Sequence, residues 1–589
     1  MNSIAAHLTR ARLARWFPFL AWPRPDRATL RGELIAGLTV AMFVIPQGVA
    51  YAALAGMPLV TGIYASFIPG LVGVLWSASS RLSVGPTALT SLLIGASLAP
   101  LAVPGSAEWV ALAVWMAMLS GALQLLMGAG RFGWLLKLVN SPVLTGFTQG
   151  ASVLIVVSQL PALLGFTGRK LAQLPGGPPP DRVAIAFGLG TMAILWFTKK
   201  RWPHLPSAMV VVVIGGVVSA AIGYALGGGA VIGTLPTGLP APYWPGPIPL
   251  ASLGALLVPT MMVTLVSFLE TASSAKVDNA RAGKLWNENQ DLIGQGLAKI
   301  ASGLSGGFAT SSSFSRSAIN LYAGAKTGWA TVVCVVLTGA ALLWVMPLLY
   351  HVPQAVLAGL VVTAILGIVR PKVFLQLWRV SRIEAATALA TFVVTIATAP
   401  DIYWGVLAGL LMSLAHFMYR HLHPRIIEVG LHPDGSLRDR HLWELPPLAT
   451  DVYALRMDAA LDFASASTLE RAIAEQVASR PGLRAVCLFA QPINRVDVTG
   501  AEVFGSIRQS LQMQGIGLHV AGLKLPAQTV LEKAGQLAPG PMLRIHRTDA
   551  EALDALAAAS LSARVAPFAH GAADAQQLVV GDEPGDHWQ

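Results

Sequence analysis

Long apolar stretches separated by short polar loops occupy the first 420 residues of the chain. A helix needs about 20 predominantly apolar residues to cross a bilayer. The pattern predicts fourteen helical spans, at 33–51, 59–77, 86–98, 108–129, 142–165, 182–198, 207–226, 251–274, 290–307, 314–323, 328–350, 353–369, 382–399 and 402–420. Two of them, 86–98 and 314–323, are too short to cross alone and reach only the midplane.

The composition indicates a polytopic membrane protein, because 54% of the 589 residues are hydrophobic and only 12% are charged. Soluble proteins carry about 25% charged residues, so a soluble enzyme is excluded. Beyond His421 the charge density rises to that of a soluble domain. We therefore expect a basic cytoplasmic segment at 1–32, a transmembrane domain at 33–420, a linker at 421–445, an α/β domain at 446–562 and a flexible tail at 563–589.

The basic residues of the loops predict how the spans are oriented. With the N-terminus placed inside, the inner loops carry Arg81, Arg131, Lys137, Lys199, Lys200, Arg201, Lys276, Arg281, Lys284, Lys326, Arg370, Lys372, Arg379 and Arg382, and the outer loops carry Arg169, Lys170 and Arg182. This positive-inside distribution predicts an even number of crossings in the lipid bilayer of the cytoplasmic (inner) membrane, with both termini in the cytoplasm. The net charge of +11 then reflects loop placement, and no nucleic-acid partner is expected.

The two short spans are the third and the tenth, which are matching positions in two seven-span halves. Paired interrupted spans are typical of binding sites in transporters with inverted repeats. Pro86 suits the first turn of the first short helix, and Ser83 and Gly85 leave backbone amides free before it. Ser313 precedes the second short helix in the same way. Free amides and the positive ends of two helix dipoles predict an anion site where the helices meet.

Arg316 lies one turn into the second short helix, within the hydroxyl-rich segment 310–317. A charge at the bilayer midplane costs roughly 2.5–3.5 kcal/mol on insertion scales, and such residues usually face a cavity on a substrate path. The alternative is that the side chain extends to a lipid headgroup. We expect Arg316 to strengthen the anion site.

Seven motifs occur in order along the chain. They are IPQGVAYAALAGMP at 45–58, TGIYAS at 61–66, SSRLSVGP at 79–86, SPVLTGFTQG at 141–150, ETASSAK at 270–276, NQDLIGQGL at 289–297 and SFSRSAIN at 313–320. Together they resemble the SulP (sulfate permease) family over almost the whole chain. The resemblance implies an α-helical membrane domain of fourteen spans in two inverted seven-span repeats. It also implies a core domain that moves against a gate domain, an elevator-like mechanism, and a homodimer.

The resemblance places the bound anion between the third and tenth half-helices. Matching motif positions imply that Gln47, Tyr51, Thr87, Ser315 and Arg316 line the pocket. Alternative roles are an interhelical hydrogen bond for Gln47 and a packing contact for Tyr51.

Glu270 is the only carboxylate deep in the eighth span. Burial favours the neutral form of a carboxyl group, which makes Glu270 a candidate carrier of a coupling proton. The resemblance also favours protons, since family members with Glu here resemble proton-coupled carriers, whereas sodium–bicarbonate members carry Asp followed by a Thr-containing sodium site. Lys299 departs from the Asn more usual in the family. It could pair with Glu270 and hold it ionised, replace a coupling cation, or extend to a cytoplasmic crevice, and these alternatives stay open.

Beyond about Leu448, alternating strands and helices predict an α/β domain with helices covering a sheet. We expect strands at 452–457, 485–489 and 517–522 and helices at 466–479 and 501–514. The segment NRVDVTG at 494–500 resembles the signature of the STAS domain, in which hydroxyls of related regulators accept phosphate. Val498 takes a hydroxyl position, so helix capping is favoured over a regulatory role for Asp497 and Thr499. The resemblance leaves open a regulatory protein partner.

Neither a catalytic constellation nor a metal-ligand spacing stands out, because Cys334 and Cys487 are isolated and His416, His421 and His423 lack acidic neighbours in the sequence. We therefore expect a transporter of a small inorganic or organic anion rather than an enzyme, with no cofactor or metal. The leading interpretation is secondary active uptake of sulfate or a small dicarboxylate with protons. The alternatives are a sodium-coupled bicarbonate symporter or an anion exchanger, and, from other classes, an anion channel or a sensor.

Overall fold

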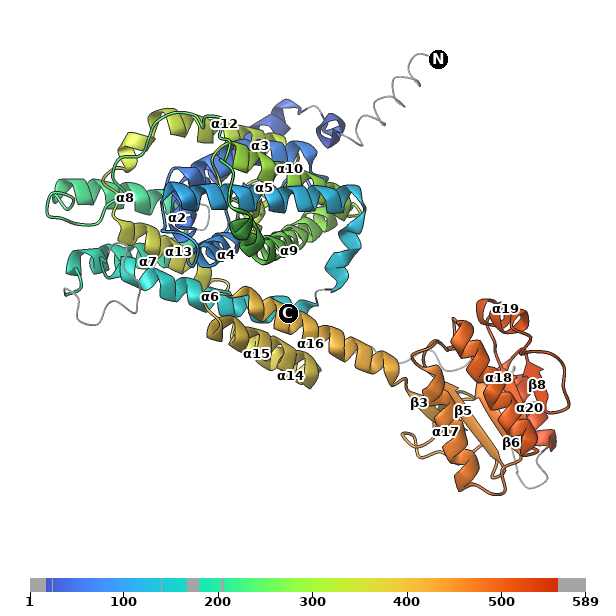
Figure 1. The fold of residues 1–589 in the computed structure, drawn as a ribbon. Coiled ribbons are helices and arrows are strands. Elements are labelled where there is room, and N and C mark those ends of the chain that lie inside the picture. Colours follow the sequence, from blue (N-terminus) through green and yellow to red (C-terminus); the bar gives the residue numbers. More distant parts are fainter. Residues whose placement is uncertain (1–16, 24, 139, 167–178, 203–205, 560–589) are drawn as a thin grey trace, which may run out of the picture. The chain divides into compact units, whose positions relative to one another are not determined.

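The computed structural model describes residues 17–559 apart from 24, 139, 167–178 and 203–205 (Figure 1). The chain forms two compact units, one up to Leu414 and one from Ala415. Residues 1–16 of the predicted basic segment, the outer-loop residues Arg169 and Lys170, and the tail at 563–589 lie outside the described residues.

The first unit is helical, and a helix coincides with each of the fourteen predicted apolar spans. These helices are α2 (Arg27–Leu54), α3 (Thr61–Trp76), α4 (Ala88–Leu98), α5 (Ala107–Ala129), α6 (Ser141–Leu163), α7 (Arg182–Arg201), α8 (Ser207–Ala221), α9 (Leu250–Arg281), α10 (Glu288–Leu304), α11 (Phe314–Tyr322), α12 (Trp329–Trp344), α13 (Gln354–Leu366), α15 (Arg382–Ala397) and α16 (Tyr403–Leu422), the last of which continues into the second unit. Short 3-10 turns occur at η1 (Pro18–Ala21), η2 (Phe132–Leu138) and η4 (Met346–Leu349).

Two features of the first unit differ from the prediction. Helix α2 begins at Arg27, inside the expected basic segment, because the Asp26 side chain caps it by accepting the Thr29 N–H at 2.8 Å. An unpredicted helix, α14 (Lys372–Val380), packs against α15. Its nine residues mix basic and apolar side chains, so a search for long apolar runs passes over it.

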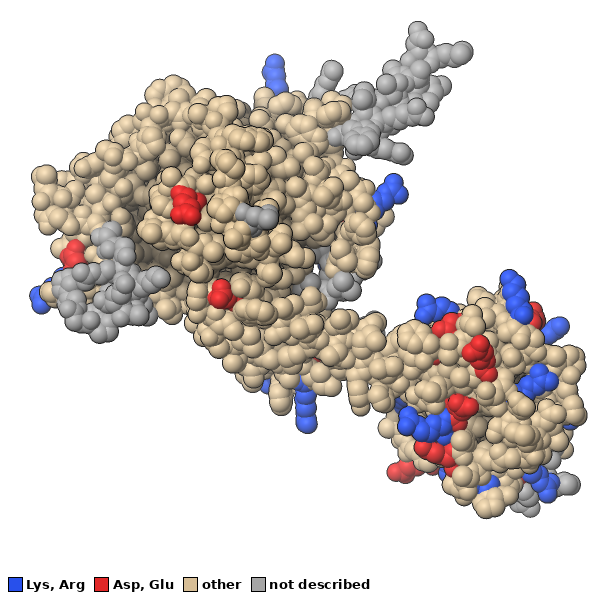
Figure 2. All heavy atoms as spheres, in the orientation of Figure 1, with Lys and Arg blue, Asp and Glu red and all other residues tan. Residues whose placement is uncertain are grey.

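The surface of the first unit is apolar. Figure 2 shows few charged side chains on its visible face, whereas the second unit carries both signs. Within the described part of the chain, four helices are long and apolar enough to span a bilayer, and six shorter apolar helices accompany them. The four are Thr29–Leu54, Ala107–Ala129, Ser141–Leu163 and Ala251–Arg281.

The helices of the first unit pack in two sets. In one set α10 packs against α5 and α3, and α12 packs against α2 and α3. In the other α6 packs against α15 and α13, and α13 packs against α7. Helices α5 and α10 approach closely because glycines face each other where they meet. A Cβ on Gly121 would lie only 2.7 Å from the Gly296 carbonyl oxygen.

A two-residue strand pair packs against α3 and α9. Strand β1 (Val84–Gly85) runs antiparallel to β2 (Ser311–Ser312), with Gly85 opposite Ser311. Because α4 follows β1 and α11 follows β2, this pairing brings the N-terminal ends of the two short helices together.

The second unit is a six-stranded sheet covered by helices. Its strands are β3 (Ile426–Leu431), β4 (Leu437–Asp439), β5 (Val452–Met457), β6 (Ala485–Phe489), β7 (Gly517–Ala521) and β8 (Leu543–His546), in the order β4-β3-β5-β6-β7-β8. Strands β5 to β8 are parallel, and β3 and β4 join antiparallel. The helices are α17 (Ala466–Ser479), α18 (Val498–Met513), α19 (Leu525–Lys533) and α20 (Asp549–Ala559).

Both faces of this sheet are buried, which explains its nearly continuous apolar strands. Leu455 and Leu488 pack with α17, α18 and α19, while Ala454 and Cys487 on the opposite face pack with α20.

The predicted linker at 421–445 is wrong in part, since it contains β3 and β4. Ile427 and Val429 are buried against the sheet, and β3 pairs with β5. Helix α18 begins at Val498, three residues before the predicted start at 501, because Asp497 caps it there.

Candidate functional site

The N-terminal ends of α4 and α11 are capped by hydroxyls and meet at the β1–β2 pair. The Thr87 Oγ1 accepts the Thr90 N–H at 3.4 Å, and the Ser313 Oγ accepts the Arg316 N–H at 3.4 Å. The Ser313 N–H donates to the Ser83 carbonyl oxygen at 3.0 Å and so extends the pairing. The positive ends of two helix dipoles therefore act on one region, which favours an anion there.

Arg316 is buried behind these helix ends, with 2% of its surface exposed. Its Nη1 donates to the Pro86 carbonyl oxygen at 2.9 Å and to the Gln47 Oε1 at 3.4 Å, and its Nε donates to the Ser83 Oγ at 3.3 Å. Its Nη2 has no hydrogen-bond partner among the described residues and lies 3.1 Å from where a Cβ on Gly85 would stand. The side chain thus extends between the helices, not toward a headgroup.

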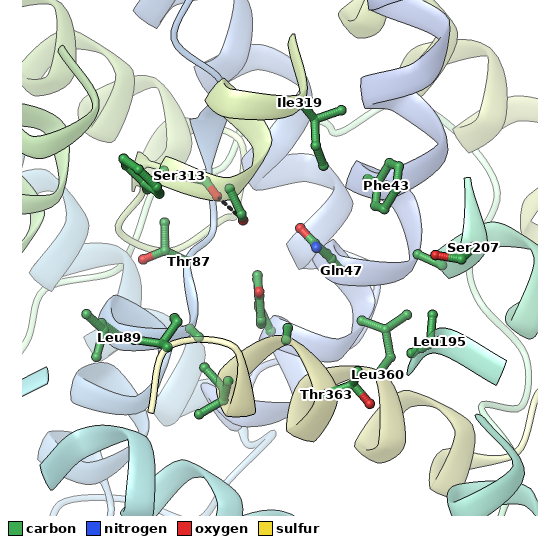
Figure 3. Close-up of a pocket in the computed structure, with 18 of the residues that line it drawn as sticks. Phe43, Gln47, Thr87, Leu89, Leu195, Ser207, Ser313, Ile319, Leu360 and Thr363 are labelled. Carbon is green, nitrogen blue, oxygen red and sulfur yellow. Dashed lines mark hydrogen bonds between the residues drawn. The ribbon is translucent and has the colours of Figure 1, made fainter. Parts of the chain in front are cut away.

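A cavity of about 420 Å³ opens in front of the two helix ends. Its polar lining comes from α2, α9 and the starts of α4 and α11, as Figure 3 shows for Gln47, Thr87 and Ser313. The opposite wall comes from α7, α8 and α13, with Leu195, Ser207, Leu360 and Thr363 labelled in Figure 3. The cavity thus lies between the two sets of helices.

The structure brings most of the predicted anion-site residues to this cavity. Gln47, Tyr51, Thr87, Ser313 and Ser315 line it, and so does the candidate proton carrier Glu270. Arg316 and Gly85 do not line it but lie directly behind, in contact through the strand pair. The sequence did not reveal Ser207 or Thr363, because no local pattern indicates which distant helix faces a given site.

Glu270 is tied to the start of α4. The Thr87 Oγ1 donates to the Glu270 Oε2 at 2.8 Å, and it lies 2.7 Å from the Thr90 Oγ1. One hydroxyl therefore connects the helix end that borders the cavity to the candidate proton carrier.

Lys299 lies away from the cavity lining and is fully buried. Its Nζ donates to the Ser120 Oγ on α5 at 2.9 Å and to the Ser267 Oγ on α9. No ion pair joins Lys299 to Glu270 in the described part of the chain, and Lys299 does not extend to a surface.

In the second unit, Asp497 acts as the cap of α18. Its Oδ1 accepts the Gly500 N–H at 2.8 Å, and its Oδ2 accepts the Phe463 N–H at 3.0 Å. Thr499 is exposed in the first turn of that helix. His421 does have an acidic neighbour in space, since its Nε2 lies 3.5 Å from the Asp462 Oδ2. Nowhere in the described residues do three His, Cys, Asp or Glu gather closely enough to hold a metal ion.

Comparison with known proteins identifies both units. Residues 30–391 match the Sulfate permease family, and residues 447–552 match the STAS domain. A probable sulfate transporter of Mycobacterium tuberculosis (MT1781) is 31% identical over 539 residues, which cover 89% of this chain and 96% of that relative. The chloroplastic sulfate transporter 4.1 of Arabidopsis thaliana is 28% identical over 568 residues, covering 90% of this chain and 82% of that protein.

Solved structures share the fold at low sequence identity. The murine Slc26a9 anion transporter in its inward-facing state superimposes with a TM-score of 0.83 at 18% identity, covering 93% of this chain and 95% of that one. The transmembrane domain of the cyanobacterial bicarbonate transporter BicA gives a TM-score of 0.56 at 22% identity, covering 66% of this chain and 99% of that domain. The chain therefore belongs to the sulfate permease family, as a multi-pass membrane transporter, not an enzyme, that carries a C-terminal STAS domain.

Proposed function

We propose that this protein takes up sulfate or a small dicarboxylate together with protons, as a secondary active transporter. The observation that carries the proposal is the 2.8 Å hydrogen bond from Thr87 to Glu270. It connects a carboxyl group to the helix end that borders the cavity, so a proton on Glu270 and an anion at that helix end occupy neighbouring positions. Each then reduces the electrostatic cost of the other.

The anion binds at the meeting point of α4 and α11 in this proposal. Backbone amides and the hydroxyls of Ser313 and Ser315 donate to its oxygens, and Arg316 supplies a fixed positive charge behind them. Thr87 borders the anion while its hydroxyl donates to Glu270. Such preorganised donors suit a tetrahedral oxyanion or a carboxylate. The names of the bacterial and plant relatives favour sulfate as the substrate.

The position of the cavity supports an elevator-like movement. The set of helices that binds the anion would move against α7, α8 and α13, which form the opposite wall. Matching helix contacts support two inverted seven-span repeats: α5–α10 corresponds to α12–α3, α6–α15 to α13–α7, and α2–α11 to α9–α4. In each pair, the second contact is the first one moved by seven spans.

The proposal also includes the cytoplasmic membrane, cytoplasmic termini, a homodimer and a regulatory protein at the STAS domain. Loop charge supports the orientation, because basic residues gather on one side. Accessibility of single cysteines to a membrane-impermeant reagent tests the orientation. Crosslinking in native membranes tests the dimer, and pull-down with the full chain tests the regulatory partner.

The decisive experiment reconstitutes the purified protein in liposomes and measures uptake of labelled sulfate, succinate and bicarbonate. Each anion is tested with an inward proton gradient, then with an inward sodium gradient. Proton-driven sulfate or succinate uptake supports the proposal. Sodium-driven bicarbonate uptake contradicts the coupling ion, and currents that exceed carrier rates contradict a transporter cycle.

A further inference from the structure

Among the described residues, the fully buried Lys299 side chain donates only to hydroxyl groups. Its Nζ donates to the hydroxyls of Ser120 and Ser267. The Ser267 hydroxyl donates its own hydrogen to the Thr264 carbonyl oxygen at 3.1 Å and accepts from the Gln124 Nε2 at 3.0 Å. Lys299 therefore acts as a donor at Ser267, a role that an ammonium group fills.

Ser267 connects Lys299 to the region of the anion site. Ser267 precedes Glu270 by three residues, so both side chains lie on one face of α9. The Ser267 carbonyl oxygen accepts from the Ser311 Oγ at 3.0 Å, and Ser311 pairs with Gly85 in the strand pair. Ser267 thus lies between Lys299 and Glu270, and also between Lys299 and the strand pair that precedes the two half-helices.

Three charged groups act on each other in this region. Arg316 and Lys299 both interact electrostatically with Glu270, and Glu270 is the charged group that acts on Lys299. Neither cation forms an ion pair with Glu270 in the described structure. The carboxyl group therefore interacts with two cationic side chains and can gain or lose a proton without breaking a salt bridge.

We propose that Lys299 sets the valence of the transported anion at two, which rests on the proposed proton-coupled function. With a proton on Glu270, Arg316 and Lys299 contribute two positive charges, and a divalent oxyanion neutralises them. The loaded site then crosses the membrane with no net charge. The empty site with ionised Glu270 carries one positive charge, so the voltage-dependent step is the return of the empty carrier.

With a neutral residue at position 299, the voltage-dependent step would instead be the movement of the loaded carrier. The loaded site would carry one negative charge and the empty site none. The overall cycle would still move one proton with one divalent anion, so net stoichiometry does not distinguish the two cases. Sulfate–sulfate exchange does, because it uses only the loaded carrier.

The test measures exchange of labelled sulfate in proteoliposomes at equal sulfate concentration and pH 5.5 on both sides. Membrane potentials of 0 and ±100 mV are set with potassium and valinomycin. Wild-type exchange should be independent of voltage. In Lys299→Gln, exchange should slow symmetrically, by up to about threefold at 100 mV of either sign if one charge crosses the whole field. Lys299→Arg retains the charge and should resemble the wild type.

The outcomes separate this inference from the proposed function. Voltage-dependent exchange by the wild type overturns the inference even if no variant folds. Voltage-independent exchange by a folded Lys299→Gln also overturns it. A wild type that exchanges no sulfate or succinate at all contradicts the proposed function itself, and this inference with it.

Discussion

Arg316 donates from Nη1 to the carbonyl oxygen of Pro86 at 2.9 Å, which joins the start of α11 to the start of α4 across 230 residues of sequence. The same nitrogen reaches Gln47 on α2. The guanidinium group thus fixes the relative positions of three helices and places a charge behind the cavity. Its role is both electrostatic and geometric, and the two contributions can be separated by mutation.

Arg316→Ala should weaken sulfate binding by about 10- to 100-fold, because hydrogen bonds to a charged group contribute roughly 1.5–3 kcal/mol and the charge is lost as well. Arg316→Lys keeps the charge but not the planar set of donors, so its sulfate affinity should lie between those of the wild type and Arg316→Ala. Binding is measured by calorimetry or by competition against labelled sulfate. Unchanged affinity in a folded Arg316→Ala protein would contradict the proposed site.

Glu270→Gln should abolish proton-driven accumulation and spare counterflow exchange. The amide resembles a protonated carboxyl group in shape and charge, so the loaded carrier still moves, but no proton is released. Uptake under an imposed pH gradient and exchange without one are compared in the same vesicles. Thr87→Val is the matched control: it removes the 2.8 Å hydrogen bond but leaves the carboxyl group, so coupling should persist with weaker binding. Proton-driven accumulation that survives in Glu270→Gln excludes this residue as the carrier.

Gly85→Ala should reduce sulfate affinity by about tenfold. An added Cβ would lie 3.1 Å from the Arg316 Nη2 and 3.2 Å from the Ser66 Oγ, so the guanidinium group must shift. Overpacking of a well-packed site costs roughly 1–3 kcal/mol. Gly190→Ala on α7 is the control, since no atom lies within 4 Å of its added Cβ. Equal affinities in the two variants would show that the position of Arg316 tolerates displacement.

The meeting of the two half-helices could be predicted because it depends on local signals. Thr87 and Ser313 are hydroxyls placed directly before short apolar runs, where capping is favoured. Two details were wrong: Pro86 precedes α4 instead of lying in its first turn, and the Ser83 N–H is not free but donates to the Ser317 Oγ at 3.0 Å.

The opposite wall of the cavity could not be predicted, because Ser207 and Thr363 reach the cavity through helix packing alone. The partners of Lys299 also stayed open, since the sequence gives its position on α10 but not which helices surround that position.

Short elements were the other source of error. Strands β3 and β4 fall in a stretch with charged residues, and their stability comes from pairing with β5 rather than from their own pattern. Helix α14 has too few apolar residues to stand out as a span. In each case the tertiary structure supplies the stabilising contacts.

Asp497→Ala should destabilise the second unit by about 0.5–2 kcal/mol, because the carboxylate caps α18 and also accepts the Phe463 N–H. Thr499→Ala should leave stability nearly unchanged, since the side chain is exposed. Hydrogen exchange of peptides from α18 in the full chain measures both variants. If Thr499→Ala instead alters transport without altering the hydrogen exchange of α18, a regulatory role for this hydroxyl replaces the capping interpretation.

Strands β7 and β8 should lose protection in acid because of the histidine pair that joins them. The Nδ1 of His519 lies 3.0 Å from the Nε2 of His546, and burial, with the neighbouring charges of His546 and Arg544, lowers the pKa of His519 from 6.5 to about 4. An unfolded histidine binds its proton near pH 6.5, so the unfolded state gains protons first as the pH falls. The stabilisation is therefore complete above about pH 6.5 and is lost progressively toward pH 4.

The expected loss is at most about 3 kcal/mol, since one pKa unit corresponds to about 1.36 kcal/mol. Protection factors of β7 and β8 peptides, corrected for intrinsic exchange, are compared at pH 7 and pH 4.5 in the full chain. His519→Gln cannot titrate and should show a smaller drop than the wild type over this interval. An equal drop in both proteins would assign the acid sensitivity to other groups, such as the paired His546, whose pKa is also lowered by burial.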